Sequence, residues 1–539
     1  MESDSGTTRS VWMSLPSIPA LPSVDRDARA DVCVVGAGMA GLSTAYYLSR
    51  EGADVIVVDD GPIAGGETSR TTAHLTCVLD DRFHWIEQVH GSRGLVLAAE
   101  SHAAAIDAIE AVVREERIDC EFVRLDAYLF TPPGDPRDEL EREFEAARRA
   151  GLTDVEWADR APFPTFDTGR CLRFPRQAQF HPLRYLTGLG HAIGRRGGRI
   201  HRDTHVAEIE EGKPARVRTR EGFVITADHV VVATNTPVHT RVKIHTKQAP
   251  YRTYVVGIRV EEGSAVRALY YDTQKPYHYV RLHRLPPDEG DGEVVIVGGE
   301  DHKTGQKDDA ESRWAALESW TRTRFPMAQE VLFRWSGQVF ETIDGVAFIG
   351  RDRGGVYLAT GDSGMGMTHG TIAGLLLTDL IHGRDHRWAS FYDPDRKGLR
   401  AAGEFARENL NVVAQYADHL SGGDVSSIEE IEIGAGAVLR DGMKKVAVYR
   451  DREGAVHARS AVCPHLGCVV SWNSAERTWD CPCHGSRFDR YGRVITGPAN
   501  VDLEPTEAPG QEAPGQQDRE RSRPDPGRFR PDRPSPPPA

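Results

Sequence analysis

A glycine-rich turn between an apolar strand and a helix limits the fold of this chain more than any other feature. The turn has the spacing Gly36-x-Gly38-x-x-Gly41, directly follows an apolar run at 31–35 and opens a helical stretch at 42–50. Gly36 suits the tight turn, Gly38 lets the backbone approach a pyrophosphate, and Gly41 lets the helix pack closely on the strand. The free N–H groups at the helix start would then face the phosphates. The pattern predicts a dinucleotide-binding unit.

The predicted second strand, at 55–58, ends in two acidic residues. Asp59 is placed to accept hydrogen bonds from the diol of a ribose. Asp60 beside it keeps open the simpler interpretation of a solvated acid pair at a strand end. These residues alone leave both FAD and NAD open as the cofactor.

Short apolar runs and helical stretches continue to alternate as far as about residue 400. This alternation indicates an α/β fold. We expect β-type runs at 223–226, 229–233, 293–297 and 356–359, and helices at 101–115, 140–150 and 372–381.

Length, charge and hydropathy narrow the class of protein. A chain of 539 residues corresponds to about three or four structural units. The net charge of −14 argues against a nucleic-acid-binding protein, which usually shows a basic stripe. No run reaches the ~18 apolar residues of a membrane helix, and the first residues lack the basic start and apolar stretch of a signal peptide. We therefore expect a cytoplasmic protein without a transmembrane segment, whose oligomeric state the sequence leaves unknown.

The pattern changes after about residue 421. Short β segments separated by turns, at 437–439, 445–449, 457–461 and 469–472, predict a small all-β module. From residue 504 the chain is dominated by Pro, Gly, Gln, Arg and Asp, and such a composition predicts disorder. We expect four parts: an N-terminal segment at 1–27, a main domain at 28–420, a β module at 425–503 and a disordered tail at 504–539.

Four of the eight cysteines fall within one short stretch, together with two histidines. They form the motifs C-x-H-x-x-C and C-x-C-H-G-S, with Cys463, His465, Cys468, Cys481, Cys483 and His484. In a reducing compartment such a cluster indicates a metal rather than structural disulfides. Zinc held by Cys₂His₂ is one candidate, but zinc fingers keep the cysteine pair separate from the histidine pair. Here each loop supplies one Cys and one His, with two cysteines left over.

The segment VVGAGMAGLSTAYYLSREGADVIVVD, at 34–59, resembles the N-terminus of FAD-dependent oxidoreductases of the D-amino-acid oxidase and sarcosine oxidase superfamily. The resemblance extends to about residue 400, and the segments 229–235 and 356–369 resemble later flavin motifs of that superfamily. It implies an α/β FAD-binding domain, Rossmann-like and of the glutathione-reductase type, with an inserted antiparallel-sheet substrate domain. The FAD-binding parts would lie at about 28–100, 170–245 and 335–400, and the substrate part at about 101–169 and 246–334.

The same resemblance implies which residues contact FAD. They are Gly36, Gly38, Met39, Ala40, Gly41, Asp59, Asp60, Gly66, Thr71, Thr72, Ala233, Thr234, Gly361, Gly364, Met365, Gly366, Met367 and Thr368. In the segment 356–369 a helix N-terminus would face the flavin, where it would stabilise negative charge on the reduced cofactor.

The cysteine and histidine pattern closely resembles Rieske domains over about 425–503. In a Rieske centre two cysteines hold one iron of a [2Fe–2S] cluster and two histidines hold the other. The resemblance implies the ligands Cys463, His465, Cys481 and His484. It also implies a disulfide between Cys468 and Cys483, as in the subclass found in cytochrome bc complexes.

Three residues are candidates for binding or converting the substrate. Strand alternation places Tyr277, Tyr279 and Arg281 on one face, where Arg and Tyr could clamp a carboxylate. A solvated strand face is the alternative. His74 could bind the flavin or the substrate, or be an ordinary loop histidine. The catalytic candidates are His74, Tyr279 and Arg281.

These features together predict an FAD-dependent dehydrogenase that oxidises a small substrate. By resemblance the substrate is an amine or an amino acid, and the electrons pass through the Rieske centre to an unknown one-electron acceptor. One alternative is a reductase that receives electrons from an outside donor through the cluster into FAD. A second alternative is a redox sensor based on the cluster.

Overall fold

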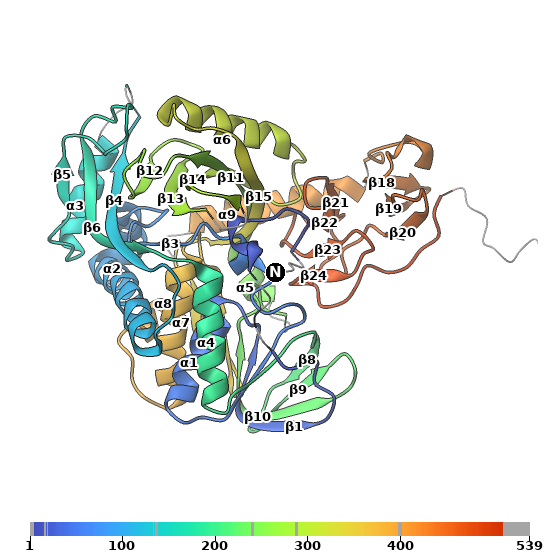
Figure 1. Ribbon diagram of the computed structural model, residues 1–539. Coiled ribbons are helices and arrows are strands. Elements are labelled where there is room, and N and C mark those ends of the chain that lie inside the picture. Colours follow the sequence, from blue (N-terminus) through green and yellow to red (C-terminus); the bar gives the residue numbers. More distant parts are fainter. Residues whose placement is uncertain are drawn as a thin grey trace, which may run out of the picture.

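The computed structural model describes residues 5–15, 18, 20–132, 134, 138–238, 242–285, 289–396, 402–419 and 421–509. An eight-stranded sheet, a nine-stranded sheet and a smaller β module account for the architecture of these residues. In Figure 1 the nine-stranded sheet lies above the eight-stranded sheet, and the β module lies beside both.

The eight-stranded sheet has the order β16-β17-β10-β1-β2-β7, and the β8–β9 hairpin continues from β10. The neighbours from β17 to β7 along this order are parallel. Its strands are β1 (Ala28–Val35), β2 (Val55–Val58), β7 (Arg199–His201), β8 (Val206–Glu210), β9 (Ala215–Thr219), β10 (Val224–Val232), β16 (Phe348–Arg351) and β17 (Val356–Thr360). The predicted α/β fold is confirmed.

Both faces of β1 are buried, which accounts for its continuously apolar sequence. Val32 and Val34 join the core beneath the helices, while Cys33 and Val35 join a second core on the opposite face. The helices on the first face are α1 (Met39–Arg50), α2 (Phe83–Glu116), α4 (Pro182–Arg195) and α7 (Gly366–Ile381), which lie together in Figure 1.

The nine-stranded sheet has the order β15-β11-β14-β13-β12-β4-β6-β3, with β5 beside β6. All of its described pairs are antiparallel except β12 with β4. Its strands are β3 (His74–Leu75), β4 (Val123–Phe130), β5 (Glu156–Ala158), β6 (Cys171–Gln179), β11 (Gln248–Val260), β12 (Leu269–Asp272), β13 (His278–Arg284), β14 (Glu293–Lys303) and β15 (Val331–Thr342). Helices α3 (Asp138–Arg149) and α6 (Ala310–Arg324) pack on it.

The two sheets divide the chain differently from the expected FAD-binding and substrate parts. Strand β6 falls within the stretch 170–245 that was expected to bind FAD, yet it pairs with β3, β4 and β5 in the nine-stranded sheet. These pairings join segments far apart in the chain, so local hydrophobic periodicity could not reveal them.

The β module consists of two small sheets. One contains β18 (Gly436–Asp441), β19 (Lys444–Arg450) and β20 (Val456–Ser460), and the other β21 (Ser471–Asn473), β22 (Thr478–Asp480), β23 (Arg487–Asp489) and β24 (Val494–Thr496). The predicted all-β module is confirmed. The module extends past its expected end at residue 503. The Ser460 N–H donates a hydrogen bond of 2.8 Å to the carbonyl of Glu504, the first residue of the expected tail. Of the expected tail, residues 510–539 lie outside the described residues.

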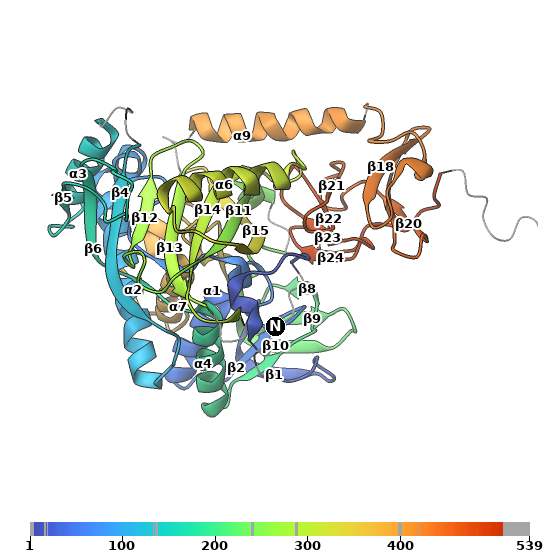
Figure 2. The same ribbon diagram turned by 45° about the horizontal axis from the view of Figure 1, so that its top comes forward.

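A long helix connects the main domain with the β module. Helix α9 (Ala402–Gln415) runs along both parts in Figure 2 and is followed by a 3₁₀ turn, Tyr416–His419. Glu408 pairs with Lys303 of β14, whereas Tyr416 donates to the Leu466 carbonyl at 2.6 Å. The remaining short helices are α5 (Val242–His245) and α8 (Ala389–Tyr392). Among the described residues, no helix has the length and apolar character needed to cross a membrane.

Candidate flavin and iron–sulfur sites

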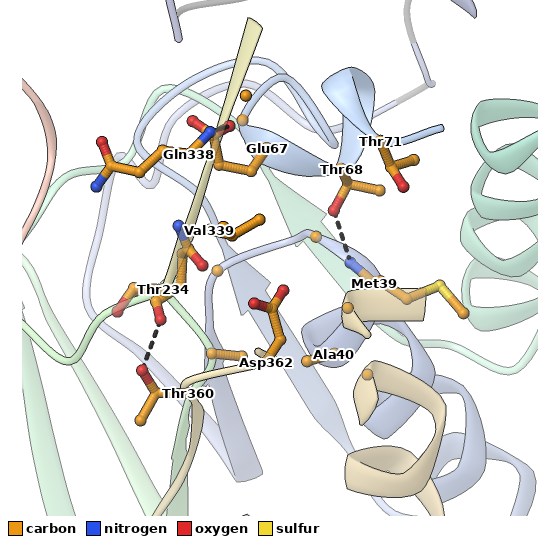
Figure 3. A pocket seen from close by; sticks show the side chains of 18 of the residues that line it. Met39, Ala40, Glu67, Thr68, Thr71, Thr234, Gln338, Val339, Thr360 and Asp362 are labelled. Carbon is orange, nitrogen blue, oxygen red and sulfur yellow. Dashed lines mark hydrogen bonds between the residues drawn. The ribbon is translucent and has the colours of Figure 1, made fainter. Parts of the chain in front are cut away.

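A cavity of about 300 Å³ lies between the two large sheets. Its wall includes every residue expected to contact FAD except Gly41 and Thr368. Figure 3 shows Met39 and Ala40 on one side of this cavity and Gln338 and Val339 on the other. The expected FAD residues, although spread from 36 to 367, are therefore brought together by the fold.

The three glycines of the first turn have different surroundings. Gly36 has a φ of +102°, and a Cβ atom there would lie 2.4 Å from the Ala233 carbonyl oxygen. A Cβ at Gly41 would lie 1.8 Å from the Gly36 oxygen, so Gly41 serves the packing of helix on strand. A Cβ at Gly38 would meet only the Thr68 hydroxyl, at 3.1 Å, and Gly38 lines the cavity. Such an open backbone suits close approach by a pyrophosphate.

Asp59 holds the glycine turn from the end of β2. Its carboxylate accepts hydrogen bonds from the backbone N–H of Ala37, at 2.6 Å, and of Gly61, at 3.1 Å. Asp59 and Asp60 both line the cavity. Contact of Asp59 with a ribose stays a prediction.

The loop between β17 and α7 forms the opposite part of the cavity. Figure 3 shows the Asp362 carboxylate pointing into the space near Met39 and Ala40, and one of its oxygens is buried without a hydrogen-bond partner among the described residues. Burial raises the pKa of Asp362 to about 7. Gly366 begins α7 at the cavity wall, whereas Thr368 hydrogen-bonds His102 and the Met365 carbonyl instead. A buried acceptor and an open helix N-terminus suit a flavin, which carries both N–H and carbonyl groups.

Of the three catalytic candidates, His74 and Tyr279 line the cavity. His74 Nδ1 lies 3.0 Å from the Thr72 hydroxyl, and Nε2 lies 3.3 Å from the Val280 carbonyl oxygen. Burial lowers the pKa of His74 to about 3, so the ring is neutral. Tyr279 shares a hydrogen bond of 2.7 Å with Thr253.

Arg281 does not reach the cavity, and its expected role as a carboxylate clamp is wrong. The side chain is 0% exposed and donates to the carbonyl oxygens of Ala73 and Phe180, at 2.7 and 3.2 Å. It also lies over the ring of Trp12, with 5.2 Å to the centroid. Strand alternation correctly predicts the face of Arg281, but not that the segment around Ala73 covers it.

Five acidic residues on the cavity wall were not predicted from the sequence: Glu67, Asp80, Asp301, Glu341 and Asp362. Burial raises the pKa of Asp80 to about 6 and that of Asp301 to about 7, and it also raises the pKa of Glu341. The sequence did carry one signal for these acids, namely a polar residue at the end of an apolar strand, as at Asp301.

The two loops of the β module bring the cysteine and histidine motifs together. Cys468 and Cys483 form a disulfide, as the resemblance implied. Cys463 and Cys481 are free and each only 1% exposed, and the ring centroids of His465 and His484 lie 5.0 Å apart. The Nδ1 atom of His465 is buried and has no hydrogen-bond partner in the part of the chain that the structure describes. Two buried thiols and two imidazoles fit a Rieske cluster, which needs two ligands of each kind.

Residues near the expected cluster ligands also contact the flavin cavity. The Gly485 carbonyl, next to His484, accepts a hydrogen bond of 2.9 Å from the Gln338 side chain. His245 of α5 hydrogen-bonds His465 across the same boundary, with 3.1 Å between Nδ1 and Nε2. The β module also adds Ile495, Thr496, Gly497 and Asn500 to the cavity wall.

A buried network of charges fixes this boundary. Arg70 and Glu476 form an ion pair of 2.9 Å in which both side chains are 0% exposed. Arg252 pairs with Asp480, just before Cys481, at 3.3 Å. The N-terminal segment takes part as well, since Thr8 donates its N–H to Glu476 at 3.0 Å.

Comparison with known proteins agrees with both sites. The model of the DAO family, FAD dependent oxidoreductases, matches residues 31–380, and that of the Rieske [2Fe-2S] domain matches residues 423–507. The iron-sulfur protein YhfW of Bacillus subtilis (strain 168) is 29% identical over 496 residues, covering 90% of this chain and 95% of its own.

Two further similarities concern the main domain. Gamma-glutamylputrescine oxidoreductase of Escherichia coli (strain K12) is 28% identical over 374 residues, which are 67% of this chain and 85% of that protein. The fold resembles that of glycine oxidase from Geobacillus kaustophilus, with a TM-score of 0.58, 18% identity, and coverage of 69% of this chain and 99% of that one. The cofactors are FAD and a Rieske-type [2Fe–2S] cluster. The chain is an oxidoreductase that belongs to the DAO family of FAD-dependent enzymes and carries a C-terminal Rieske domain.

Proposed function

We propose that this protein oxidises a small amine or amino acid at FAD and passes the electrons singly through its Rieske centre to an acceptor. The flavin supplies two-electron oxidation, and the cluster supplies one-electron transfer. Gly36, Gly38 and the residues around Asp362 would hold the flavin. Cys463, His465, Cys481 and His484 would hold the cluster.

The contact of His245 with His465 carries this proposal. It lies at the boundary where the β module also closes part of the flavin cavity. Two redox sites that served separate reactions would need neither a shared wall nor a hydrogen bond from the main domain to a ligand of the cluster. The buried pair of Arg70 and Glu476 favours a fixed rather than a transient approach of the two parts.

Similarity supports an amine or amino acid as the substrate class. Gamma-glutamylputrescine oxidoreductase is named for an amine. The likeness to glycine oxidase supports the fold alone, because only 18% of the residues are identical.

Anaerobic titration of the holoenzyme tests the proposal. Amines and amino acids are added in turn, and the flavin absorption and the cluster spectrum are followed separately. We expect a substrate to bleach the flavin first and reduce the cluster afterwards. Reduction of the cluster by a reduced carrier, followed by the flavin, with no bleaching by any amine or amino acid, would instead support the reverse direction. A cluster response without turnover would support a sensor.

A further inference from the structure

Three of the acids on the cavity wall, each partly exposed, come from different elements. Asp80 follows β3, Asp301 lies on β14, and Glu341 lies near the end of β15. All three line the cavity beside Tyr277 and Tyr279 of the nine-stranded sheet. They therefore form one acidic wall, which we call the carboxylate wall.

A bulge directs Asp301 into this wall. The pairing of β11 with β14 shifts register between Arg252 and Tyr254, and Glu300 adopts a φ of +58°. Bulges of this kind re-aim a side chain next to a functional site. The Oδ1 atom of Asp301 is buried and has no hydrogen-bond partner among the described residues.

Tyrosines surround the carboxylate wall. Tyr277 donates to Asp80 at 3.0 Å, and its ring centroid lies 5.6 Å from that of Tyr279. Tyr279 lies over Gly298, where a Cβ atom would be 2.2 Å from its ring. The hydroxyl of Tyr271, a side chain 3% exposed on the cavity wall, also lacks a hydrogen-bond partner in the described part of the chain. Aromatic faces and carboxylates are the groups that recognise ammonium ions.

The balance of charge in the cavity excludes a good partner for a substrate carboxylate. Arg70 is the sole Lys or Arg among the described residues that line the cavity, and Glu476 neutralises it at 2.9 Å. Burial lowers the pKa of His74 to about 3 and that of His369 to about 4, so both rings are neutral. Arg281 is held by backbone carbonyls outside the cavity.

We propose that the carboxylate wall binds an ammonium group of an aliphatic di- or polyamine. This inference rests on the proposed function and names its substrate class. A carbon atom gives up hydride readily when the attached nitrogen is neutral, so the charged nitrogen at the wall is a second one, away from the reacting end. An amino acid, which carries a carboxylate beside its amine, would meet repulsion here.

The raised pKa values of Asp80 and Asp301 agree with this assignment. Burial disfavours ionisation of both acids in the absence of a cation, and the neighbouring carboxylates of Asp80 and Glu300 add to this effect at Asp301. A bound ammonium group would favour their charged forms.

Three four-carbon compounds test the inference with the holoenzyme at pH 8. Putrescine has two ammonium groups, butylamine has one, and 4-aminobutyrate replaces the second ammonium group with a carboxylate. Binding is read from the rise in the temperature of thermal unfolding and from the shift of the oxidised flavin spectrum, neither of which needs turnover. We expect putrescine to bind roughly tenfold or more tightly than either other compound, because charge-assisted hydrogen bonds are worth about 1.5–3 kcal/mol each.

Two variants locate the binding group. Asp301→Asn and Glu341→Gln should each weaken putrescine binding roughly tenfold and leave butylamine binding unchanged. Glu311→Gln, at an exposed position of α6 outside the cavity wall, is the control and should behave as wild type.

The inference is overturned if putrescine produces no rise in unfolding temperature and no spectral shift. It is also overturned if 4-aminobutyrate binds as tightly, or if both variants bind putrescine as wild type does. A different result tests the proposed function. Bleaching of the flavin by an amino acid would support the proposed function but would contradict the assignment of the carboxylate wall to a di- or polyamine. Putrescine that binds without bleaching the flavin would support the wall and count against putrescine oxidation.

Discussion

His245 Nδ1 lies 3.1 Å from His465 Nε2, and this hydrogen bond joins the main domain to an expected ligand of the cluster. His245 Nε2 faces the Pro237 carbonyl oxygen at 3.0 Å and therefore carries the proton. His245 Nδ1 must then accept from the Nε2–H of His465. This arrangement would leave His465 Nδ1, which has no hydrogen-bond partner among the described residues, free to bind iron.

Replacing His245 should slow electron transfer from the flavin to the cluster. His245→Ala removes the hydrogen bond that orients His465, and losses of such outer partners typically cost about 10–100-fold in metal-site function. We expect rapid mixing with substrate to show unchanged bleaching of the flavin and delayed reduction of the cluster, with an altered cluster EPR spectrum. His191→Ala, on the exposed surface of α4, is the control. Equal delays in the two variants would contradict a role for His245.

Cys463→Ser should abolish the cluster and leave the flavin in place, because the two sites use separate parts of the chain. Iron analysis and EPR would report the loss. Substrate should still bleach the flavin in a single turnover, while delivery to a one-electron acceptor that does not react with the flavin directly should slow greatly. Cys171→Ala, at a free cysteine far along the chain from both loops, should retain its iron. Undiminished delivery by the cluster-free protein would refute the relay.

Gly38→Val should weaken the binding of FAD, because the added side chain would project into the cavity. Asp59→Leu should do the same by releasing the Ala37 N–H from its carboxylate partner. The ratio of flavin to protein absorption after purification measures the effect. A Cβ atom at Gly194, in α4, meets nothing within 4 Å, so Gly194→Ala should keep its full flavin content. If both site variants keep theirs as well, the assignment of the turn is wrong.

Removing the Glu476 carboxylate should destabilise the boundary between the two redox parts. Truncating one partner of a buried ion pair costs about 3–5 kcal/mol, so Glu476→Ala should lower the temperature of thermal unfolding. Glu453→Ala, on the exposed turn 451–454, is the control and should leave it unchanged. A wild-type unfolding temperature in Glu476→Ala would show that the network does not hold the parts together.

The same residue predicts a loss of stability in acid. Burial alone would raise the pKa of Glu476, but Arg70 and Arg252 lower it from 4.5 to about 2. A carboxyl whose pKa is lower in the folded state stabilises the fold above its ordinary pKa. This contribution is complete above about pH 4.5 and is lost as the pH falls towards 2. Between these limits, the free energy of unfolding should fall more steeply with decreasing pH for wild type than for Glu476→Gln.

Two truncations should show where the β module ends and the tail begins. Removing residues 510–539 should leave the unfolding temperature and cluster content unchanged, because their composition offers little to bury. Removing the chain from Leu503 should lower both, since Leu503 is 1% exposed and the Glu504 carbonyl pairs with Ser460. A clear effect of the shorter truncation would show that the tail contacts the folded body.

Features made of neighbouring residues could be predicted from the sequence. The turn from Gly36 to Gly41 depends on the strand and helix directly beside it. Two local reasons for its glycines are the positive φ of Gly36 and the close approach of Gly41 to the Gly36 oxygen. The cysteine and histidine motifs also lie within two short loops. The disulfide of Cys468 with Cys483 followed from the resemblance that these motifs carry.

Contacts between distant segments were decided by the tertiary structure alone. Asp80, Asp301 and Glu341 come together because the loop after β3, strand β14 and the end of β15 line the same cavity, and none of these acids carries a local signal of its neighbours. Arg281 has the predicted strand face, yet the backbone near Ala73 occupies its donors. His245 reaches His465 across 220 residues of chain. Local periodicity specifies which face a side chain takes, whereas packing of the elements determines what that face meets.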